Sequence, residues 1–193
     1  MNMNATYAVI LETGYHLFAE HGFEKTSMAM IAKEVGISKP ALYYHFSSKK
    51  DIIDVIFDEI CQSIGFANFF SVQDYTKDNF EEKLISDGLS IINRQYEDDY
   101  YSRIMNQFQA LGYRNPNYSH KLIESLEGFT TGFVELLRHG ASIGAVDDKD
   151  TLIKAQMLTM IIDSIDNFIS YKLEYRYDDI WTKAVKTIVK EMS

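Results

Sequence analysis

Side chains able to contact nucleic acid gather between residues 38 and 49. The segment Ser38–Ala41 supplies a hydroxyl, an ammonium and two small apolar groups. Lys39 can donate to guanine O6 or N7, while Pro40 and Ala41 can contact a thymine methyl group. Donors suited to phosphate oxygens follow within two helical turns, namely Tyr43, Tyr44, His45 and Lys49. These types and spacings predict a helix that reads base edges with its first turn and holds the DNA backbone with the remainder.

Two short helices must hold those side chains. Ser27 can cap a first helix that Gly36 ends, and Ser38 can begin a second with Pro40 in its first turn, where a missing N–H is tolerated. Two short helices around a tight glycine turn match the helix-turn-helix motif, whose second helix enters the major groove. The free amides at the start of the first helix favour an anion, so Ser27 joins the predicted DNA-binding residues.

Charge is distributed unevenly along the chain. The 193 residues carry a formal net charge of −9, yet residues 1–50 contain five lysines against four glutamates. Residues 51–193 contain 14 Lys and Arg against 24 Asp and Glu. A basic segment on an acidic body favours a polyanionic partner for the basic part. Chance clustering of surface lysines is the alternative reading.

Composition indicates a globular chain. Apolar residues make up 46% and charged residues 24% of it. The longest uncharged stretch, residues 60–73, is 14 residues long, against the ~20 that a membrane-spanning helix needs. No basic leader precedes the apolar run near the N-terminus, and the single cysteine, Cys61, cannot form an internal disulfide. We therefore expect a cytoplasmic protein without a membrane partner.

Apolar residues recur at helical spacing nearly throughout, which predicts an all-α fold. Short helices give way to long ones near Lys49, where the charge also changes sign. This predicts two domains, residues 1–48 as a helix-turn-helix DNA-binding domain and residues 49–193 as a helical ligand-binding and dimerisation domain. The predicted helices span residues 5–21, 27–35, 38–44, 49–70, 77–95, 98–112, 117–140, 149–174 and 178–192.

The stretch GFEKTSMAMIAKEVGISKPALYYHFSSKKDI resembles the N-terminal domain of TetR/AcrR-type bacterial transcriptional repressors. The resemblance covers about a quarter of the chain and departs mildly at Gly14, where alanine is more usual. It implies a three-helix DNA-binding head, a connecting fourth helix, and a body that binds a ligand and dimerises through its last two helices. By position it also implies DNA contacts by Ser38, Lys39, Pro40, Ala41, Tyr43, Tyr44, His45 and Lys49.

The last two predicted helices are candidates for a dimer interface. The segment 151–171 is apolar on more than one face, which indicates burial on more than one side. Two such helices from each of two chains would form a four-helix interface with two-fold symmetry. A core within one chain is the alternative. The predicted interface residues are Leu158, Ile161, Ile162, Ile165, Ile169, Trp181, Val185 and Ile188.

Aromatic and methionine side chains in the body are candidates to line a pocket for a small hydrophobic effector, because methionine adapts to irregular shapes and tyrosine adds a polar group. Core packing is the competing reading for each. The roles of Asp163 and Asp166, inside an apolar run, stay open between pairing, solvation and contact with a cationic ligand. The candidates are Phe66, Phe70, Tyr96, Tyr101, Met105, Phe108, Phe129, Phe133, Met157 and Met160.

Signatures of catalysis are missing from the sequence. It has no phosphate-binding loop, no dinucleotide fingerprint, no nucleophile elbow and no His/Cys cluster at metal-ligand spacing. We expect no enzyme activity, no metal and no cofactor. The sequence predicts a ligand-responsive repressor that binds an inverted-repeat operator as a homodimer and is released by a small hydrophobic effector. The alternative is a helical small-molecule-binding module without operator binding.

Overall fold

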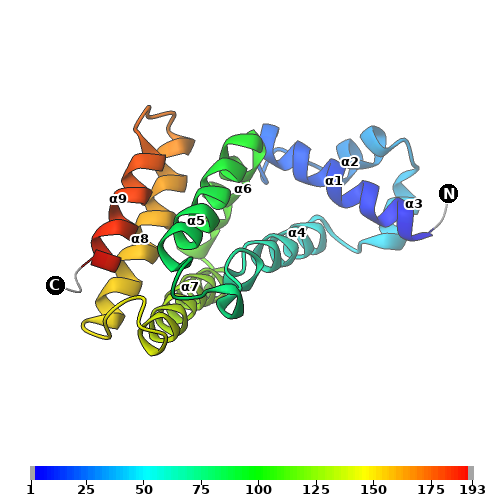
Figure 1. The fold of residues 1–193 in the computed structure, drawn as a ribbon. Helices are drawn as coiled ribbons and strands as arrows, with labels where there is room; N and C mark the ends of the chain where they lie inside the picture. The colour runs from blue at the N-terminus through cyan, green and yellow to red at the C-terminus, as the bar shows by residue number, and fades with distance from the viewer. Residues whose placement is uncertain (1–2, 191–193) are drawn as a thin grey trace. The chain divides into compact units, whose positions relative to one another are not determined.

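The computed structural model describes residues 3–190, which form α-helices and two short 3-10 turns and contain no strand (Figure 1). The all-α prediction is confirmed. The elements are α1 (Met3–His21), α2 (Met28–Val35), α3 (Lys39–His45), α4 (Lys49–Ser63), η1 (Phe66–Asn68), η2 (Val72–Asp74), α5 (Phe80–Glu97), α6 (Asp99–Gly112), α7 (Pro116–Ser142), α8 (Thr151–Ser170) and α9 (Tyr177–Lys190).

The ends of α2 and α3 follow from their capping residues. Ser27 Oγ accepts a hydrogen bond from the Met30 amide at 3.3 Å, and Ser38 Oγ accepts one from the Ala41 amide at 3.3 Å. Gly36 ends α2 with a φ of 77°, in the left-handed region that glycine enters without steric cost. The sequence-based boundaries of the helix-turn-helix are therefore confirmed, together with the physical reason for them.

The predicted helix 49–70 is correct through residue 63 and wrong over residues 64–70. The helix α4 ends at Ser63, and Gly65 then adopts an extended conformation with φ −61° and ψ 142°. The aromatic run after it forms the 3-10 turn η1 and a loop instead. The last predicted helix, 178–192, corresponds to α9, and its final two residues lie outside the described part of the chain.

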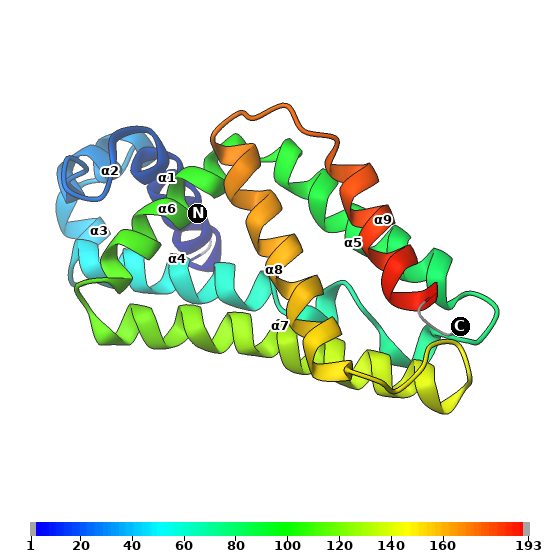
Figure 2. The ribbon, with the colours of Figure 1, turned by 90° about the vertical axis from the view of Figure 1, so that its left-hand side faces the viewer.

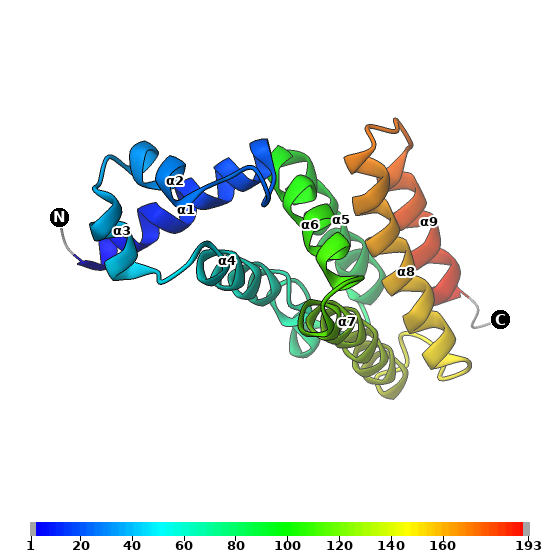
Figure 3. The ribbon, with the colours of Figure 1, turned by 180° about the vertical axis from the view of Figure 1, so that it is seen from behind.

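The chain folds into two compact units. Unit 1 contains α1 to α4, α6 and the first residues of α7, through His120. Within it, α1 packs against α2, α4 and α6, and a short turn joins α2 to α3 (Figure 3). The Phe57 and Phe108 rings stack in its core with centroids 4.2 Å apart.

Unit 2 contains the residues from Ile64 to Asp98 and those from Lys121 onward. In it α5 packs against both α8 and α9 (Figure 2). The fully buried Trp181 donates from Nε1 to the carbonyl oxygen of Ile85 at 3.1 Å. Gly88 on α5 makes this approach possible, because a Cβ at that position would lie 2.1 Å from the indole.

These compact units divide the chain differently from the predicted functional boundary at residue 48, which stays a prediction. Among residues 3–190, no helix combines the length and apolar character needed to cross a membrane. No group of three or more His, Cys, Asp or Glu side chains gathers for metal binding in that same part of the chain.

Candidate nucleic-acid interface

The first turn of α3 faces solvent. Ser38, Lys39, Pro40 and Ala41 are all exposed, whereas the next residue, Leu42, is fully buried. A helix anchored by one buried leucine and exposed at its N-terminal end presents its first side chains outward. All four residues predicted to meet base edges therefore lie together on the surface of unit 1.

The second half of α3 continues that surface. Tyr43 and Tyr44 are 51% and 75% exposed, which leaves both phenol rings accessible to a partner. His45 is half-buried, with its ring 5.5 Å from that of Tyr44. Phe46 is buried and stacks on Tyr7 of α1 with ring centroids 4.8 Å apart, which fixes the end of α3 against α1.

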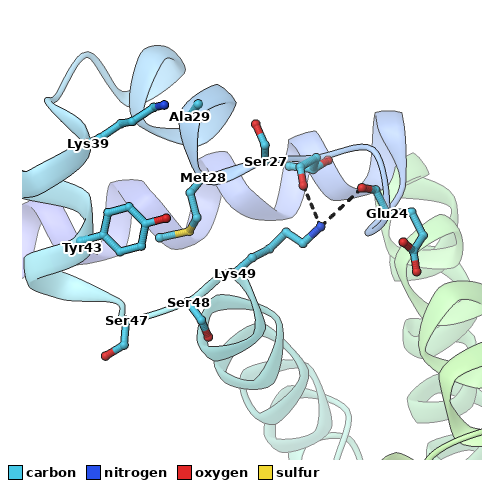
Figure 4. A pocket seen from close by; sticks show the side chains of 10 residues that line it. Glu24, Ser27, Met28, Ala29, Lys39, Tyr43, Ser47, Ser48 and Lys49 are labelled. Atoms are coloured by element: carbon cyan, nitrogen blue, oxygen red, sulfur yellow. Dashed lines mark hydrogen bonds between the residues drawn. The ribbon is translucent and has the colours of Figure 1, made fainter.

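An open depression of about 530 Å³ brings four predicted DNA-binding residues together (Figure 4). Ser27 comes from the start of α2, Lys39 and Tyr43 from α3, and Lys49 from the start of α4. Hydroxyl and ammonium groups from three helix starts suit the oxygen atoms of a phosphate backbone. The remaining lining residues are Glu24, Thr26, Met28, Ala29, Ser47 and Ser48.

Unit 1 carries further exposed positive charge outside the lining of this depression. Besides Lys39, the lysines Lys25, Lys33 and Lys50 are exposed on unit 1. Lys50 forms an ion pair with Asp54 on the same helix. Exposed lysines around a helix-turn-helix provide the electrostatic attraction that a phosphate backbone requires.

Lys49 has protein partners that the sequence did not indicate. Its Nζ donates to the carbonyl oxygens of Phe23 at 2.6 Å and Thr26 at 2.9 Å, with Glu24 O at 3.5 Å. The predicted phosphate contact of Lys49 therefore competes with bonds to the loop between α1 and α2.

Two further sets of contacts could not be predicted from the sequence, because their partners lie far apart along the chain. Gln107 Nε2 donates to Phe18 O at 2.9 Å, and Gln107 Oε1 accepts from the Phe23 amide at 2.7 Å. The Tyr118 hydroxyl donates to Asp54 Oδ1 at 2.5 Å, and burial together with this carboxylate raises the pKa of Tyr118. No local pattern reveals such pairs.

The candidate effector residues fall into separate places. Met105 and Phe108 are buried in unit 1, and Tyr101 is half-buried there. Met157, Met160 and Tyr96 are exposed on unit 2. Four of the candidates contact one another in an aromatic cluster within unit 2, namely Phe66, Phe70, Phe129 and Phe133.

The predicted dimer residues lie mostly inside unit 2. Their side chains pack into the core of a single chain, so a partner cannot reach them directly. Ile161 and Ile169 are half-buried, and Asp163 and Asp166 of the same helix are exposed and half-buried respectively. Partial desolvation raises the pKa of Asp163. The buried residues among them are Leu158, Ile162, Ile165, Trp181, Val185 and Ile188.

A second apolar stripe occupies the opposite side of α8. The sequence contains the signal for it, since the helix is apolar on more than one face, but periodicity does not tell which face turns inward. Its members are exposed in the single chain and comprise Leu152, Ile153, Met157, Met160 and Phe168, with Ile180 on the neighbouring α9.

Comparison with known proteins agrees with the helix-turn-helix. Residues 10–56 match the family described as bacterial regulatory proteins, tetR family. Over 45 residues the chain is 47% identical to the biofilm operon icaADBC negative transcriptional regulator IcaR of Staphylococcus aureus (strain Newman). That alignment covers 23% of this chain and 24% of IcaR, so the chain spans about a quarter of the length of this relative.

The fold of nearly the whole chain occurs in solved structures. A TetR transcription regulator from Haloarcula marismortui superposes with a TM-score of 0.79 at 16% identity, over 98% of this chain and 99% of that one. The regulator FadR of Bacillus subtilis, solved with stearoyl-CoA, superposes with a TM-score of 0.69 at 20% identity. The superposition covers 97% of this chain and 100% of FadR. Residues 10–56 therefore form an N-terminal domain of the tetR family, and the chain as a whole has a fold that TetR regulators share.

Proposed function

We propose that this chain represses transcription by binding an inverted-repeat operator as a homodimer, and that a small hydrophobic effector releases it. The exposed first turn of α3 carries the proposal. Ser38, Lys39, Pro40 and Ala41 form its surface, inside a domain that matches the TetR family. The second helix of a helix-turn-helix uses this turn to reach base edges in the major groove.

The exposed apolar stripe of α8 supports the dimer. Met160 is 67% exposed and Ile153 is 56% exposed, and they lie on the side of α8 that the core of unit 2 leaves uncovered. Contiguous exposed apolar side chains mark interaction surfaces. Two copies that meet through this stripe, with α9 alongside, would bury it and form the two-fold four-helix interface.

The aromatic cluster of unit 2 supports the effector. Phe66 stacks on Phe70 with centroids 4.7 Å apart and lies edge-on to Phe133 at 5.1 Å and Phe129 at 5.8 Å. Rings that already contact one another must separate to admit a ligand, and such walls favour a flat or elongated apolar molecule. The FadR structure holds stearoyl-CoA, and the stearoyl chain of that ligand is elongated and apolar.

Release requires the effector to favour a conformation that fits the operator poorly. An effector changes DNA affinity only by the difference between its own affinities for the two conformations. The coupling is reciprocal, so operator DNA must lower the affinity for the effector by the same factor.

Operator binding is tested by selecting genomic fragments from the source organism on the purified chain, followed by gel shifts on the enriched fragment. We expect an inverted repeat with half-site centres one helical turn apart, ~34–36 Å. A scrambled fragment of equal length is the control. A chain that binds apolar molecules but enriches no fragment would instead be the ligand-binding module without an operator.

The effector class is tested by thermal-shift screening of the same chain. Apolar, flat or elongated compounds should raise the melting temperature, and the same compounds should weaken the gel shift. Stabilisation by sugars, nucleotides or metal ions alone would contradict the proposed pocket.

A further inference from the structure

The loop between α1 and α2 sets where the helix-turn-helix begins. It runs from Gly22 to Thr26, directly before the cap residue Ser27. Gly22 has a φ of 85°, which reverses the chain after α1. A loop of five residues at this place determines how α2 leaves α1, and hence where the depression of Figure 4 opens.

Two parts of the loop hold themselves in place. The buried Thr26 donates from its hydroxyl to Gly22 O at 2.9 Å and to Leu17 O at 3.1 Å. The Phe23 ring packs between Phe18 and Phe108, with centroid distances of 5.3 Å and 5.0 Å. These contacts fix the Thr26 and Phe23 side chains and leave the backbone carbonyls of the same two residues to be satisfied from elsewhere.

The ammonium of Lys49 satisfies the carbonyl groups. It donates to Phe23 O at 2.6 Å and to Thr26 O at 2.9 Å, and it lies 3.5 Å from Glu24 O. Figure 4 draws the contacts with Thr26 and Glu24. An ammonium has three N–H donors, so these carbonyls occupy its full capacity. Lys49 thereby ties the loop to the first residue of α4.

The side-chain amide of Gln107 satisfies the backbone N–H of the same residue, Phe23. Its Oε1 accepts from the Phe23 N–H at 2.7 Å, while its Nε2 donates to Phe18 O at 2.9 Å and Arg103 O at 3.3 Å. Phe23 thus has its N–H held from α6 and its C=O held from α4. Gln107 carries no charge and lies on a different helix from Lys49, so the two contacts are independent.

We infer that Lys49 and Gln107 are positioning residues for operator binding, which hold the loop 22–26 from α4 and α6 and so fix α2 and α3 for the groove. The inference rests on the proposed operator binding. It differs from a phosphate contact by Lys49 in one measurable respect. A phosphate contact releases counterions, whereas a positioning contact does not.

The experiment measures the operator affinity of the Lys49→Met and Gln107→Ala variants of the whole chain at several salt concentrations. Lys50→Met, an equal change of charge at the adjacent and exposed lysine, is the matched control. We expect each positioning variant to bind the operator at least tenfold more weakly with an unchanged log–log salt slope. Lys49→Arg, which keeps the donors, should recover most of the affinity.

Amide hydrogen exchange gives a second readout that does not depend on DNA. The amides of the loop should exchange faster in both positioning variants than in Lys50→Met, including under conditions where circular dichroism shows all chains folded. If Lys49→Met does not fold, Gln107→Ala and its exchange pattern still decide the matter.

Three results separate the possibilities. A log–log salt slope that becomes shallower by ~0.9 per phosphate in Lys49→Met would make Lys49 a phosphate ligand and overturn the inference. Unchanged operator affinity in both variants would overturn it as well. Failure of the wild-type chain to bind any selected fragment would instead refute operator binding itself, and that result is visible before any variant is made.

Discussion

Lys39 is the exposed cation closest to the start of the proposed reading helix. We expect Lys39→Ala to cost ~1–3 kcal/mol on the operator and to relax the preference at one position in each half-site. Lys33→Ala removes the same charge from the exposed side of α2 and should weaken operator and scrambled DNA about equally. Binding titrations on both DNAs distinguish these outcomes. Equal losses from Lys39→Ala on the two DNAs would assign Lys39 to the backbone rather than to a base.

A second residue-scale prediction concerns the loop before α8. The nearly buried Lys154 donates from Nζ to Asp147 Oδ1 at 2.6 Å, and this bond lowers the pKa of Asp147 below its usual 3.8. A carboxyl with a lowered pKa in the folded state stabilises the fold while it is ionised, and that contribution is lost as the pH falls through its folded pKa.

Asp147→Asn should therefore unfold at a lower urea concentration than wild type at neutral pH. The gap should narrow as the pH falls through the lowered pKa of the wild-type carboxyl, because protonation then removes the charge that the Asn variant also lacks. Asp78→Asn, at an exposed acid of the same unit, serves as the control and should change little. A gap that persists unchanged in acid would show that the charge of Asp147 is not what matters.

Among the helices, capping residues proved more informative than apolar spacing. Ser27, Gly36 and Ser38 fix the ends of α2 and α3 through contacts within four residues, which sequence alone displays. The end of α4 was missed because apolar spacing continues through Phe70, while the chain turns at Gly65. The inward face of α8 was missed because both faces are apolar, and only packing with α5 and α9 selects one.

Two glycines in helices, Gly88 and Gly128, should respond oppositely to substitution by alanine, one variant losing stability and the other gaining it. At Gly88 on α5 a Cβ would lie 2.1 Å from the buried Trp181 indole, whereas at the exposed Gly128 on α7 nothing lies within 4 Å. Overpacking should make Gly88→Ala destabilising by ~1–3 kcal/mol. Gly128→Ala should instead stabilise the fold by up to ~1 kcal/mol through helix propensity.

Urea unfolding of the two alanine variants tests this contrast, because the chemical change is identical and only the surroundings differ. Stabilisation of similar size at both positions would mean that the Trp181 indole can move away from the added Cβ. That result would contradict the close packing of α5 on α9 described here.

For the molecule as a whole, substitutions on the exposed and on the buried faces of the last two helices distinguish a loss of dimerisation from a loss of folding. Met160→Glu places a charge on the exposed stripe of α8 and should yield a folded monomer. Val185→Asp buries a charge in the core, where the side chain is 0% exposed, and should prevent folding. Light scattering with circular dichroism distinguishes the two, and a wild-type monomer at micromolar concentration would contradict the dimer.

The candidate site could be predicted only in its local part. The exposed residues of α3 follow from a motif contained in about twenty residues, and the structure gathers Ser27, Lys39 and Tyr43 as expected. The partners of Lys49 could not be predicted, because its bonds to Phe23 and Thr26 span more than twenty residues and involve backbone carbonyls that every residue carries. The residue types at two distant positions do not indicate that a backbone carbonyl of one will contact the side chain of the other.

The exposed lysines of unit 1 stand on a chain whose net charge is −9, and this has a consequence for how an operator would be found. Charges are screened over ~8 Å at physiological ionic strength, so lysines close to the groove attract DNA, while the acidic remainder of the chain adds no attraction. Encounters with non-operator sequence should therefore be brief, because non-specific binding depends almost entirely on such attraction. Little of the protein would be held along the chromosome, and a small number of copies per cell would suffice to keep one operator occupied.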